Sequence, residues 1–216
     1  MQIEKNQIQI TENMCECKFE ANIGNIYCRL ASKENFKDCL DTMPHEKILD
    51  MVILYHVCIK LSPSESISLM INNKLTDSWG ISKDQLKKIA WSNTVRDNPP
   101  ILKKLGQVLM ELGVTPERDE PDVYMISNDK KYFGAVCIAY PGFQERIAER
   151  LGGDFYLLPS SVHECLAVPC GVGFVAKELR KMVRSINKNE LSEKEVLSNS
   201  VYRYNSSRQC LAIDNS

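Results

Sequence analysis

The 216-residue sequence lacks the features that would assign it to a specialised class of protein. It has no excess of one charge, since 27 Lys and Arg residues stand against 28 Asp and Glu residues, which excludes a whole-molecule field that attracts nucleic acid or anionic lipid. The longest apolar run, Met51 to Leu61, is interrupted by His56 and Lys60 and is too short to span a bilayer. The sequence also contains no internal repeat and no low-complexity tract, which argues against a repeat protein.

A secretory signal peptide is also missing, because the N-terminal stretch carries Glu4 and Glu12 and has no continuous apolar core. Nine cysteines are present, an odd number that argues against a fully paired disulfide framework. We therefore predict a cytoplasmic protein whose cysteines are mostly small buried hydrophobic residues. Residues 1–22 are polar and weakly patterned, and we expect them to be poorly ordered.

Composition is that of an ordinary globular protein, with 44% apolar and 25% charged residues. The pattern predicts an α+β fold, in which a mostly antiparallel sheet from the C-terminal half packs against amphipathic helices. N-terminal strands and helices are expected to complete the core of a single domain over residues 23–216. Residues 114–122, with two prolines and four acids, are the one candidate for a boundary within it.

Helices are predicted from capping signals and apolar stripes. Ser82 and Gln85 form a capping box, which starts a helix that we expect to run to about Thr94. The remaining predicted helices cover residues 33–40, 73–79, 100–112, 143–151 and 175–188.

Strands are predicted where Val, Ile and Tyr are enriched between turn residues. The predicted strands cover residues 23–30, 48–61, 66–71, 123–127, 134–140, 155–158, 162–168, 201–204 and 209–213. Residues 48–61 and 66–71 are expected to pair as a hairpin through the turn SPSES, and residues 123–127 and 134–140 to be joined by the polar turn NDKKYF.

The run LPSSVHE contains the densest group of reactive side chains, and its candidate catalytic residues are Ser160, Ser161, His163 and Glu164. If a strand begins at Val162, alternation places Ser161 and His163 on one face and Glu164 on the other. His163 and Glu164 then cannot act as a base and its orienting acid. A hydrolase that uses His163 with Ser160 or Ser161 needs another carboxylate, for which Glu46 and Asp154 are candidates.

The favoured interpretation is that the serines satisfy turn backbone groups and that His163 is a hydrogen-bonded residue of the sheet. We therefore predict a non-catalytic binding or regulatory module, with the LPSSVHE edge as the contact surface for a protein partner. The hydrolase is the first alternative. His45 and His56 are interpreted as core histidines, each satisfied by a neighbour.

No metal and no cofactor are predicted. The run HEC lacks the second histidine of H-E-x-x-H, because Ala167 occupies that position. Cys15 and Cys17 form a C-x-C without a second pair, and Cys165 with Cys170 needs a third ligand such as His163. The run GVGF precedes a helix but lacks the spacing of a phosphate-binding loop, since Ala176 takes the final glycine position.

The last long helix carries a basic face, whose members are Lys177, Arg180, Lys181, Arg184 and Lys188. Such a face can contact phosphates, so nucleic-acid binding is the second alternative. With a net charge of −1 for the chain, a solvated helix face is the favoured interpretation. No membrane partner is predicted.

Four runs, PHEKILDMVILY, SWGIS, GGDFYLLPSSVHE and LSNSVYRY, give the chain a family resemblance between about Leu40 and Tyr204. In these motifs the chain resembles a family of uncharacterised intracellular proteins from Gram-positive gut anaerobes, classed as a domain of unknown function. The resemblance implies an α+β fold and a cytoplasmic, bacterial setting. It implies no activity, because none is established for the family.

Overall fold

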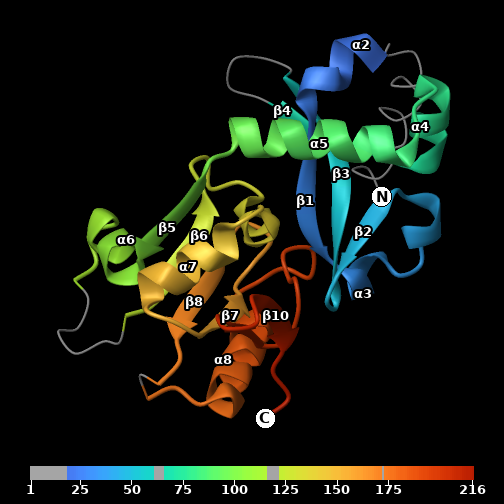
Figure 1. Ribbon diagram of the computed structural model, residues 1–216. Coiled ribbons are helices and arrows are strands. Elements are labelled where there is room, and N and C mark those ends of the chain that lie inside the picture. The colour runs from blue at the N-terminus through green and yellow to red at the C-terminus, as the bar shows by residue number, and fades with distance from the viewer. Residues whose placement is uncertain (1–18, 61–65, 116–121, 172) are drawn as a thin grey trace.

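The computed structural model describes residues 19–60, 66–115, 122–171 and 173–216, and two antiparallel sheets organise them (Figure 1). The N-terminal sheet has the order β1-β3-β2, and β4 also pairs with β3. Its strands are β1 (Ile26–Ser32), β2 (His45–Ile48), β3 (Met51–Lys60) and β4 (Ser66–Met70). The predicted hairpin is confirmed, since Val57 of β3 pairs with Leu69 of β4, although the turn SPSES falls on residues 61–65, outside the described residues.

The strand predicted over residues 48–61 is found as β3 from Met51 to Lys60, but Ile48 belongs to a separate strand, β2. Leu49 has a left-handed backbone with φ of 56°, and the chain reverses there, so that β2 pairs with β3. A leucine rarely adopts that conformation, and nothing in the apolar pattern announces it. The prediction was therefore wrong at its start.

Helices cover the N-terminal sheet, and α5 lies across it beside β1 in Figure 1. The helical segments of this half are α2 (Phe19–Asn22), η1 (Ile23–Asn25), α3 (Lys33–Phe36), η2 (Leu40–Thr42), α4 (Asn73–Trp79) and α5 (Lys83–Asp97). The capping box predicted at the start of α5 is present. Ser82 Oγ accepts the Gln85 N–H at 3.2 Å, and Gln85 Oε1 accepts the Ser82 N–H at 2.8 Å, which satisfies two otherwise free donors.

The C-terminal sheet has the order β10-β9-β7-β8-β6-β5, and every pairing in it is antiparallel. Its strands are β5 (Pro100–Lys104), β6 (Tyr124–Asn128), β7 (Phe155–Pro159), β8 (Cys165–Pro169), β9 (Tyr202–Asn205) and β10 (Cys210–Ile213). Its helical segments are α6 (Leu105–Glu111), η3 (Gly134–Ala139), α7 (Phe143–Leu151) and α8 (Ala176–Asn189). The fold is therefore α+β, as predicted.

Two predicted elements were wrong. Residues 100–104 form β5 instead of the first half of a helix, because they pair with β6 at the edge of the sheet, and the helix begins only at Leu105. Residues 134–139 form the 3₁₀ segment η3 instead of a strand. Gly134 to Ile138 are all buried, and a short apolar run that is buried on every side does not distinguish a strand from a helix.

One buried cluster contains residues from both sheets, including Leu30 and Met51 of the first and Ile126, Phe155 and Tyr202 of the second. Segment η3 packs against both β6 and β1, so it lies where the two sheets meet. We expected residues 1–22 to be poorly ordered, and residues 1–18 of this stretch lie outside the described residues. The candidate domain boundary at residues 114–122 also falls largely outside them.

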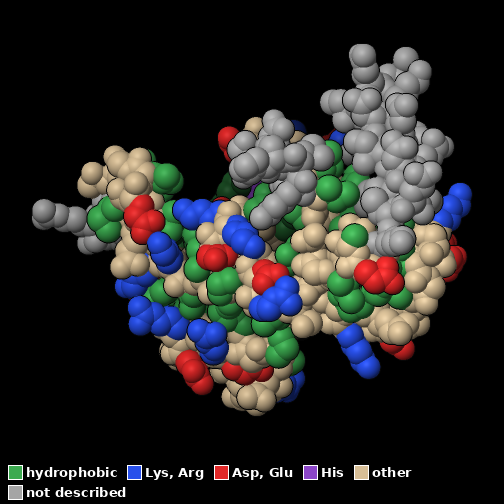
Figure 2. Space-filling view, turned by 90° about the horizontal axis from the view of Figure 1, so that it is seen from above, with side chains coloured by type: hydrophobic (Ala, Val, Ile, Leu, Met, Phe, Trp, Pro, Cys, Tyr) green, Lys and Arg blue, Asp and Glu red, His purple; other side chains and the backbone are tan. Residues whose placement is uncertain are grey.

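The surface seen from above in Figure 2 carries Lys and Arg side chains intermingled with Asp and Glu side chains. This mixture agrees with the balanced composition. Among the described residues, no helix is both long and apolar enough to cross a membrane.

Candidate functional site

The LPSSVHE run forms the hairpin loop between β7 and β8. β7 ends at Pro159 and β8 begins at Cys165, so the strand predicted from Val162 begins three residues later. The Ser161 N–H donates to the Glu164 carbonyl at 2.9 Å, which closes a turn. Ser160, Ser161, His163 and Glu164 therefore lie in a turn, where side chains do not alternate between two faces as they do in a strand. The prediction that alternation separates His163 from Glu164 was wrong.

Three hydrogen bonds hold His163 in this loop. Its backbone N–H donates to Ser161 Oγ at 3.1 Å, and its carbonyl accepts from the Ser127 hydroxyl at 2.8 Å. Its ring Nδ1 lies 3.1 Å from the Phe133 backbone N–H, a donor, so Nδ1 is the acceptor. Burial lowers the pKa of His163, and the charge of Arg29 acts in the same direction while Glu195 and Glu164 oppose it. The ring is held neutral, and it supports the backbone of Phe133.

The hydrolase alternative needs a serine and a carboxylate at the His163 ring, and the described residues place the candidates elsewhere. The Ser161 hydroxyl binds the His163 backbone instead of the ring. Glu46 accepts from Tyr55 Oη and Trp91 Nε1, each at 2.8 Å. Asp154 accepts from the Ser206 hydroxyl at 2.8 Å. No hydrogen bond between described residues joins Ser160 or Glu164 to the ring, so the hydrolase stays an untested hypothesis without a hydrogen-bonded triad.

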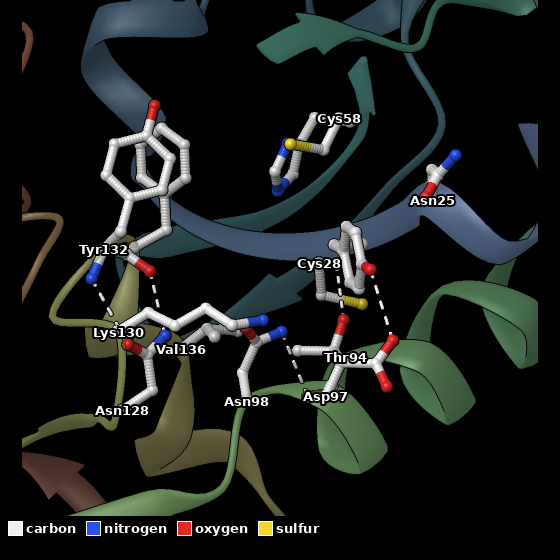
Figure 3. Close-up of a pocket in the computed structure, with 13 residues that line it drawn as sticks. Asn25, Cys28, Cys58, Thr94, Asp97, Asn98, Asn128, Lys130, Tyr132 and Val136 are labelled. Carbon is white, nitrogen blue, oxygen red and sulfur yellow. Dashed lines mark hydrogen bonds between the residues drawn. The ribbon is translucent and has the colours of Figure 1, made fainter. Parts of the chain in front are cut away.

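A cavity of about 500 Å³ lies beside this loop, between the N-terminal sheet, the end of α5 and residues 128–136 (Figure 3). We call it the junction cavity. Its polar lining comes from Asn25, Tyr27, His56, Cys58, Thr94, Asp97, Asn98, Asn128 and Lys130, and the rest from Cys28, Tyr132, Phe133 and Val136. Cys58 and Asn25 lie on one side of it in Figure 3, and Lys130 with Asn98 on the other.

The N-terminal wall of the junction cavity is set by strand register. Tyr27 of β1 pairs with His56 of β3, so both side chains point to the same face of the sheet. The Tyr27 hydroxyl donates to Asp97 Oδ2 at 3.2 Å, which ties the strand to the last residue of α5. Burial and the neighbouring Asp97 raise the pKa of Tyr27 to about 12, so the hydroxyl keeps its proton at neutral pH.

The opposite wall is the loop 129–133, and the Asn128 side chain clamps it. Asn128 Nδ2 donates to the Tyr132 carbonyl at 2.8 Å, and Asn128 Oδ1 accepts the Tyr132 N–H at 3.2 Å. Within the loop Lys131 and Phe133 have positive φ angles of 52° and 50°. Non-glycine residues in this region carry strain that the surrounding contacts must offset. The clamp and the His163 ring supply those contacts, and together they fix the rings of Tyr132 and Phe133 at the cavity.

The Phe133 ring packs against two histidine rings and one cation, Arg29. The Phe133 ring stacks on His163 at 5.6 Å between centroids and meets His56 edge to face at 5.3 Å. The Arg29 guanidinium lies 4.3 Å from the centroid of the Phe133 ring, a cation–π contact. Arg29 Nε is buried without a hydrogen-bond partner among the described residues, and the aromatic face contributes to the stabilisation of this charge.

His56 and Ser68 are the one serine–histidine pair among the described residues with a direct side-chain contact, since Ser68 Oγ lies 2.7 Å from His56 Nδ1. The pair has the spacing of a nucleophile and its base. However, burial and the charge of Arg29 lower the pKa of His56 to about 3. A histidine with that pKa is a poor proton acceptor near neutral pH, so the pair is better explained as the hydrogen-bonded core histidine that the sequence predicted.

The neutral state of His56 predicts an acid-sensitive fold. The unfolded chain binds a proton at His56 with a pKa near 6.5, whereas the folded chain does so only near pH 3. Stability is therefore complete above about pH 6.5 and is lost as pH falls below it. Between pH 6.5 and 5 we expect a loss of about 2 kcal/mol in the free energy of unfolding.

Urea denaturation of the wild type and of His56→Gln at both pH values measures this loss. Glutamine keeps a polar group near Ser68 but does not titrate, so the variant is expected to show a shallower pH dependence. Equal slopes in the two proteins would show that His56 is not the group responsible.

Sequence reasoning missed the residues that line the junction cavity. Tyr27, Asp97 and Lys130 come from three segments that are distant in sequence, and none belongs to a recognisable motif. The polar run NDKKYF was interpreted only as a turn, although exposed loops that carry charged and aromatic residues are common sites of binding. The run NDKKYF was therefore the one feature of the sequence that could have indicated a binding site here.

The other predicted sites are placed as follows. The basic residues of α8 lie on its outer side, where Arg180 donates to the Asp214 carbonyl, and nucleic-acid binding there stays a prediction. Among the described residues no three His, Cys, Asp or Glu side chains gather as metal ligands. Cys15 and Cys17 lie outside the described residues, and Cys165 is fully buried while Cys170 is partly exposed.

Comparison with known proteins assigns the chain to a family but not to an activity. The model of a family of unknown function, DUF5688, matches residues 2–206. That match spans nearly the whole chain. No curated protein and no solved structure matches the chain.

Proposed function

We propose that this chain, which belongs to the DUF5688 family, is a non-catalytic binding protein whose ligand occupies the junction cavity. The observation that carries the proposal is a cavity of about 500 Å³ with convergent polar groups and aromatic walls at the junction of two sheets. Ligand sites are commonly concave, of this volume and largely pre-formed. Here the clamp on Tyr132 and the support of Phe133 by His163 provide the pre-formed wall.

The lining favours a small ligand that has a flat ring and several hydrogen-bonding groups. Tyr27, Tyr132 and Phe133 offer rings against which a planar or pyranose ring packs. Asp97 is the acceptor on one side, where it already accepts from Arg96 and Tyr27, and Lys130 is the donor on the other. Lys130 Nζ donates to a neutral group, Asn98 Oδ1, at 3.0 Å, and it forms no ion pair with another described residue. Nucleosides and sugars combine these chemical features.

Binding is favoured over catalysis, because the described lining residues include no histidine that titrates near neutral pH and the Arg96 contact lowers the pKa of the Asp97 carboxyl. His56, the histidine in the lining, is neutral, and its Nδ1 is occupied by Ser68. The contribution of the LPSSVHE run is indirect in this proposal, because His163 holds the backbone of Phe133 and positions the wall.

The proposal predicts that Lys130→Gln weakens ligand binding about tenfold, because a hydrogen bond from a charged donor is lost. A panel of nucleosides and monosaccharides is screened by ligand-observed NMR, and the affinity of any binder is then measured for both proteins. Lys131→Gln is the matched control, since Lys131 is the neighbouring lysine but does not line the cavity. Equal losses in the two variants would contradict the proposed position of the ligand.

Cys58 provides a direct readout of occupancy. It lines the junction cavity and is partly exposed, whereas Cys210 is exposed outside it. A ligand in the cavity is expected to slow alkylation of Cys58 by iodoacetamide and to leave Cys210 unchanged, as measured by peptide mass spectrometry. If no compound of the panel slows the reaction at Cys58, the proposed ligand class is wrong.

A further inference from the structure

A further hollow lies in the C-terminal half, between α7 and the β9–β10 hairpin. Its volume is about 300 Å³, and its lining includes Glu145, Glu149, Gly152, Tyr204 and Gln209. We call it the α7 groove. It shares no residue with the junction cavity, so it is independent of the proposed function.

The α7 groove carries negative charge that no ion pair between described residues neutralises. Glu145 and Glu149 lie one turn apart on the same face of α7, and neither forms an ion pair or a side-chain hydrogen bond with a described residue. The C-terminal end of α7, at Leu151, adds the partial negative charge of its free carbonyl groups. A cation in the groove is therefore attracted from two directions.

The nearby basic residues have other contacts. The Arg146 guanidinium lies over the Phe143 ring at 5.5 Å. Arg146 and Arg150 line a different hollow beside Leu102 of β5, which Glu149 also borders. Arg203 forms an ion pair with Asp154 at 3.0 Å. None of these three lines the α7 groove.

The hydroxyl group of Tyr204, unpaired among the described residues, indicates that the groove binds a ligand. Its side chain is 1% exposed and its hydroxyl is buried without a hydrogen-bond partner among the described residues, although the residue lines the α7 groove. A buried hydroxyl without a partner costs free energy, and such groups are few in folded proteins. Burial and the charge of Glu145 raise the pKa of Tyr204, so the hydroxyl keeps its proton. Its oxygen is free to accept a hydrogen bond from a donor in the groove.

We propose that the α7 groove binds an ammonium or guanidinium group, with Glu145 and Glu149 supplying the charge and the Tyr204 hydroxyl accepting one N–H. The group belongs either to a free amine or to a lysine or arginine side chain of a peptide. Both sources share the cationic head and the apolar methylene chain, which Ala148 and Gly152 accommodate on the wall of the groove.

Isothermal titration calorimetry with two probes, agmatine and a capped Gly-Arg-Gly peptide, tests the proposal. The double variant Glu145→Gln/Glu149→Gln is expected to weaken binding of both probes at least about tenfold, because both charges are removed. Tyr204→Phe is expected to weaken it about threefold to tenfold, the loss of one hydrogen bond to a charged group. Glu178→Gln is the matched control, since Glu178 is an acid in the first turn of α8, away from the groove.

Thermal unfolding without a probe separates binding from a structural role of Tyr204. Because its hydroxyl has no partner, Tyr204→Phe is expected to leave the melting temperature unchanged or to raise it. Tighter binding of the peptide than of agmatine identifies a peptide as the source, and the reverse identifies a free amine. Binding of neither probe to the wild type, or equal weakening by Glu178→Gln, would overturn the proposal.

Discussion

Replacing Gly134 with alanine is expected to lower the free energy of unfolding by about 3 kcal/mol or more, the upper end of what overpacking of a core costs. A Cβ atom at this position overlaps Ser127 Oγ and lies 2.5 Å from the Asn128 backbone nitrogen and 2.7 Å from the His163 carbonyl oxygen. Two of these atoms form the Ser127–His163 hydrogen bond, so the added methyl group displaces the contact that joins β6 to the β7–β8 loop. Backbone atoms cannot move aside as a flexible side chain does.

The comparison variant is Gly24→Ala. A Cβ at Gly24 meets nothing within 4 Å, and its backbone is not left-handed, so the same substitution is expected to change stability by less than about 0.5 kcal/mol. Chemical denaturation of both variants measures the difference. The Gly134 variant is also expected to lose protection of Cys58 by ligand, because the displaced residues Ser127, Asn128 and His163 hold the loop 129–133. Two variants of equal stability would contradict the account of close packing at η3.

Asp50→Ala is expected to destabilise the protein by about 3 kcal/mol, because three hydroxyl groups lose one charged acceptor. Tyr202 Oη donates to Asp50 Oδ1 at 2.5 Å, and the Ser198 and Ser200 hydroxyls donate to Asp50 Oδ2 at 2.7 and 2.8 Å. Asp50 lies in the turn between β2 and β3, whereas its partners lie in and before β9 of the other sheet. Tyr202 is fully buried, so water does not replace the lost acceptor.

Asp50→Asn separates charge from shape at this position. The single amide oxygen still accepts hydrogen bonds, but the charge is lost and an NH2 group, which cannot accept, replaces the other oxygen, so a loss of about half that of the alanine variant is expected. Asp77→Asn is the control, since Asp77 is exposed on α4 and its side chain forms no hydrogen bond with a described residue. Urea denaturation measures all three. If Asp50→Ala costs less than about 0.5 kcal/mol, the carboxylate does not join the two sheets energetically.

The predictions that succeeded rest on interactions between residues near each other in sequence. The capping box at Ser82 and Gln85 is an interaction across three residues, and it is present as predicted. The helix α7 was predicted with its bounds, because its apolar face repeats within nine residues and Gly152 ends it with φ of 84°. The helix α8 is also found within one residue of the predicted bounds.

The predictions that failed concern segments whose environment comes from distant parts of the chain. Residues 100–104 have an apolar pattern that fits a helix, but pairing of Leu102 with Ile126 in β6 makes them a strand. The run GAVCIAY is apolar enough for a strand, yet it is enclosed by both sheets and forms η3. In each case tertiary pairing or burial outweighs local preference.

The candidate site also combines features that local sequence predicts with features that depend on distant parts of the chain. The sequence predicted His163 to be a hydrogen-bonded residue of the sheet; the ring is hydrogen-bonded to the Phe133 backbone, but the residue lies in the loop between β7 and β8. The turn of LPSSVHE depends on where β8 begins, and that is set by pairing with β6 and β7. The junction cavity needs Tyr27, Asp97 and Lys130 together, and only the packing of the N-terminal sheet against residues 128–136 brings them there.

The sequence by itself determined the α+β class, the positions of the well-capped helices and the absence of a strong charge field, since each follows from composition or from contacts within a few residues. The tertiary structure alone decided that two sheets meet at η3, that a cavity remains beside it, and that the Tyr204 hydroxyl has no hydrogen-bond partner among the described residues. These features arise from register and burial between segments far apart in sequence, as at Asp50 and Ser200, which are 150 residues apart. Local sequence patterns carry no information on such contacts, because they extend over only a few turns or strand residues.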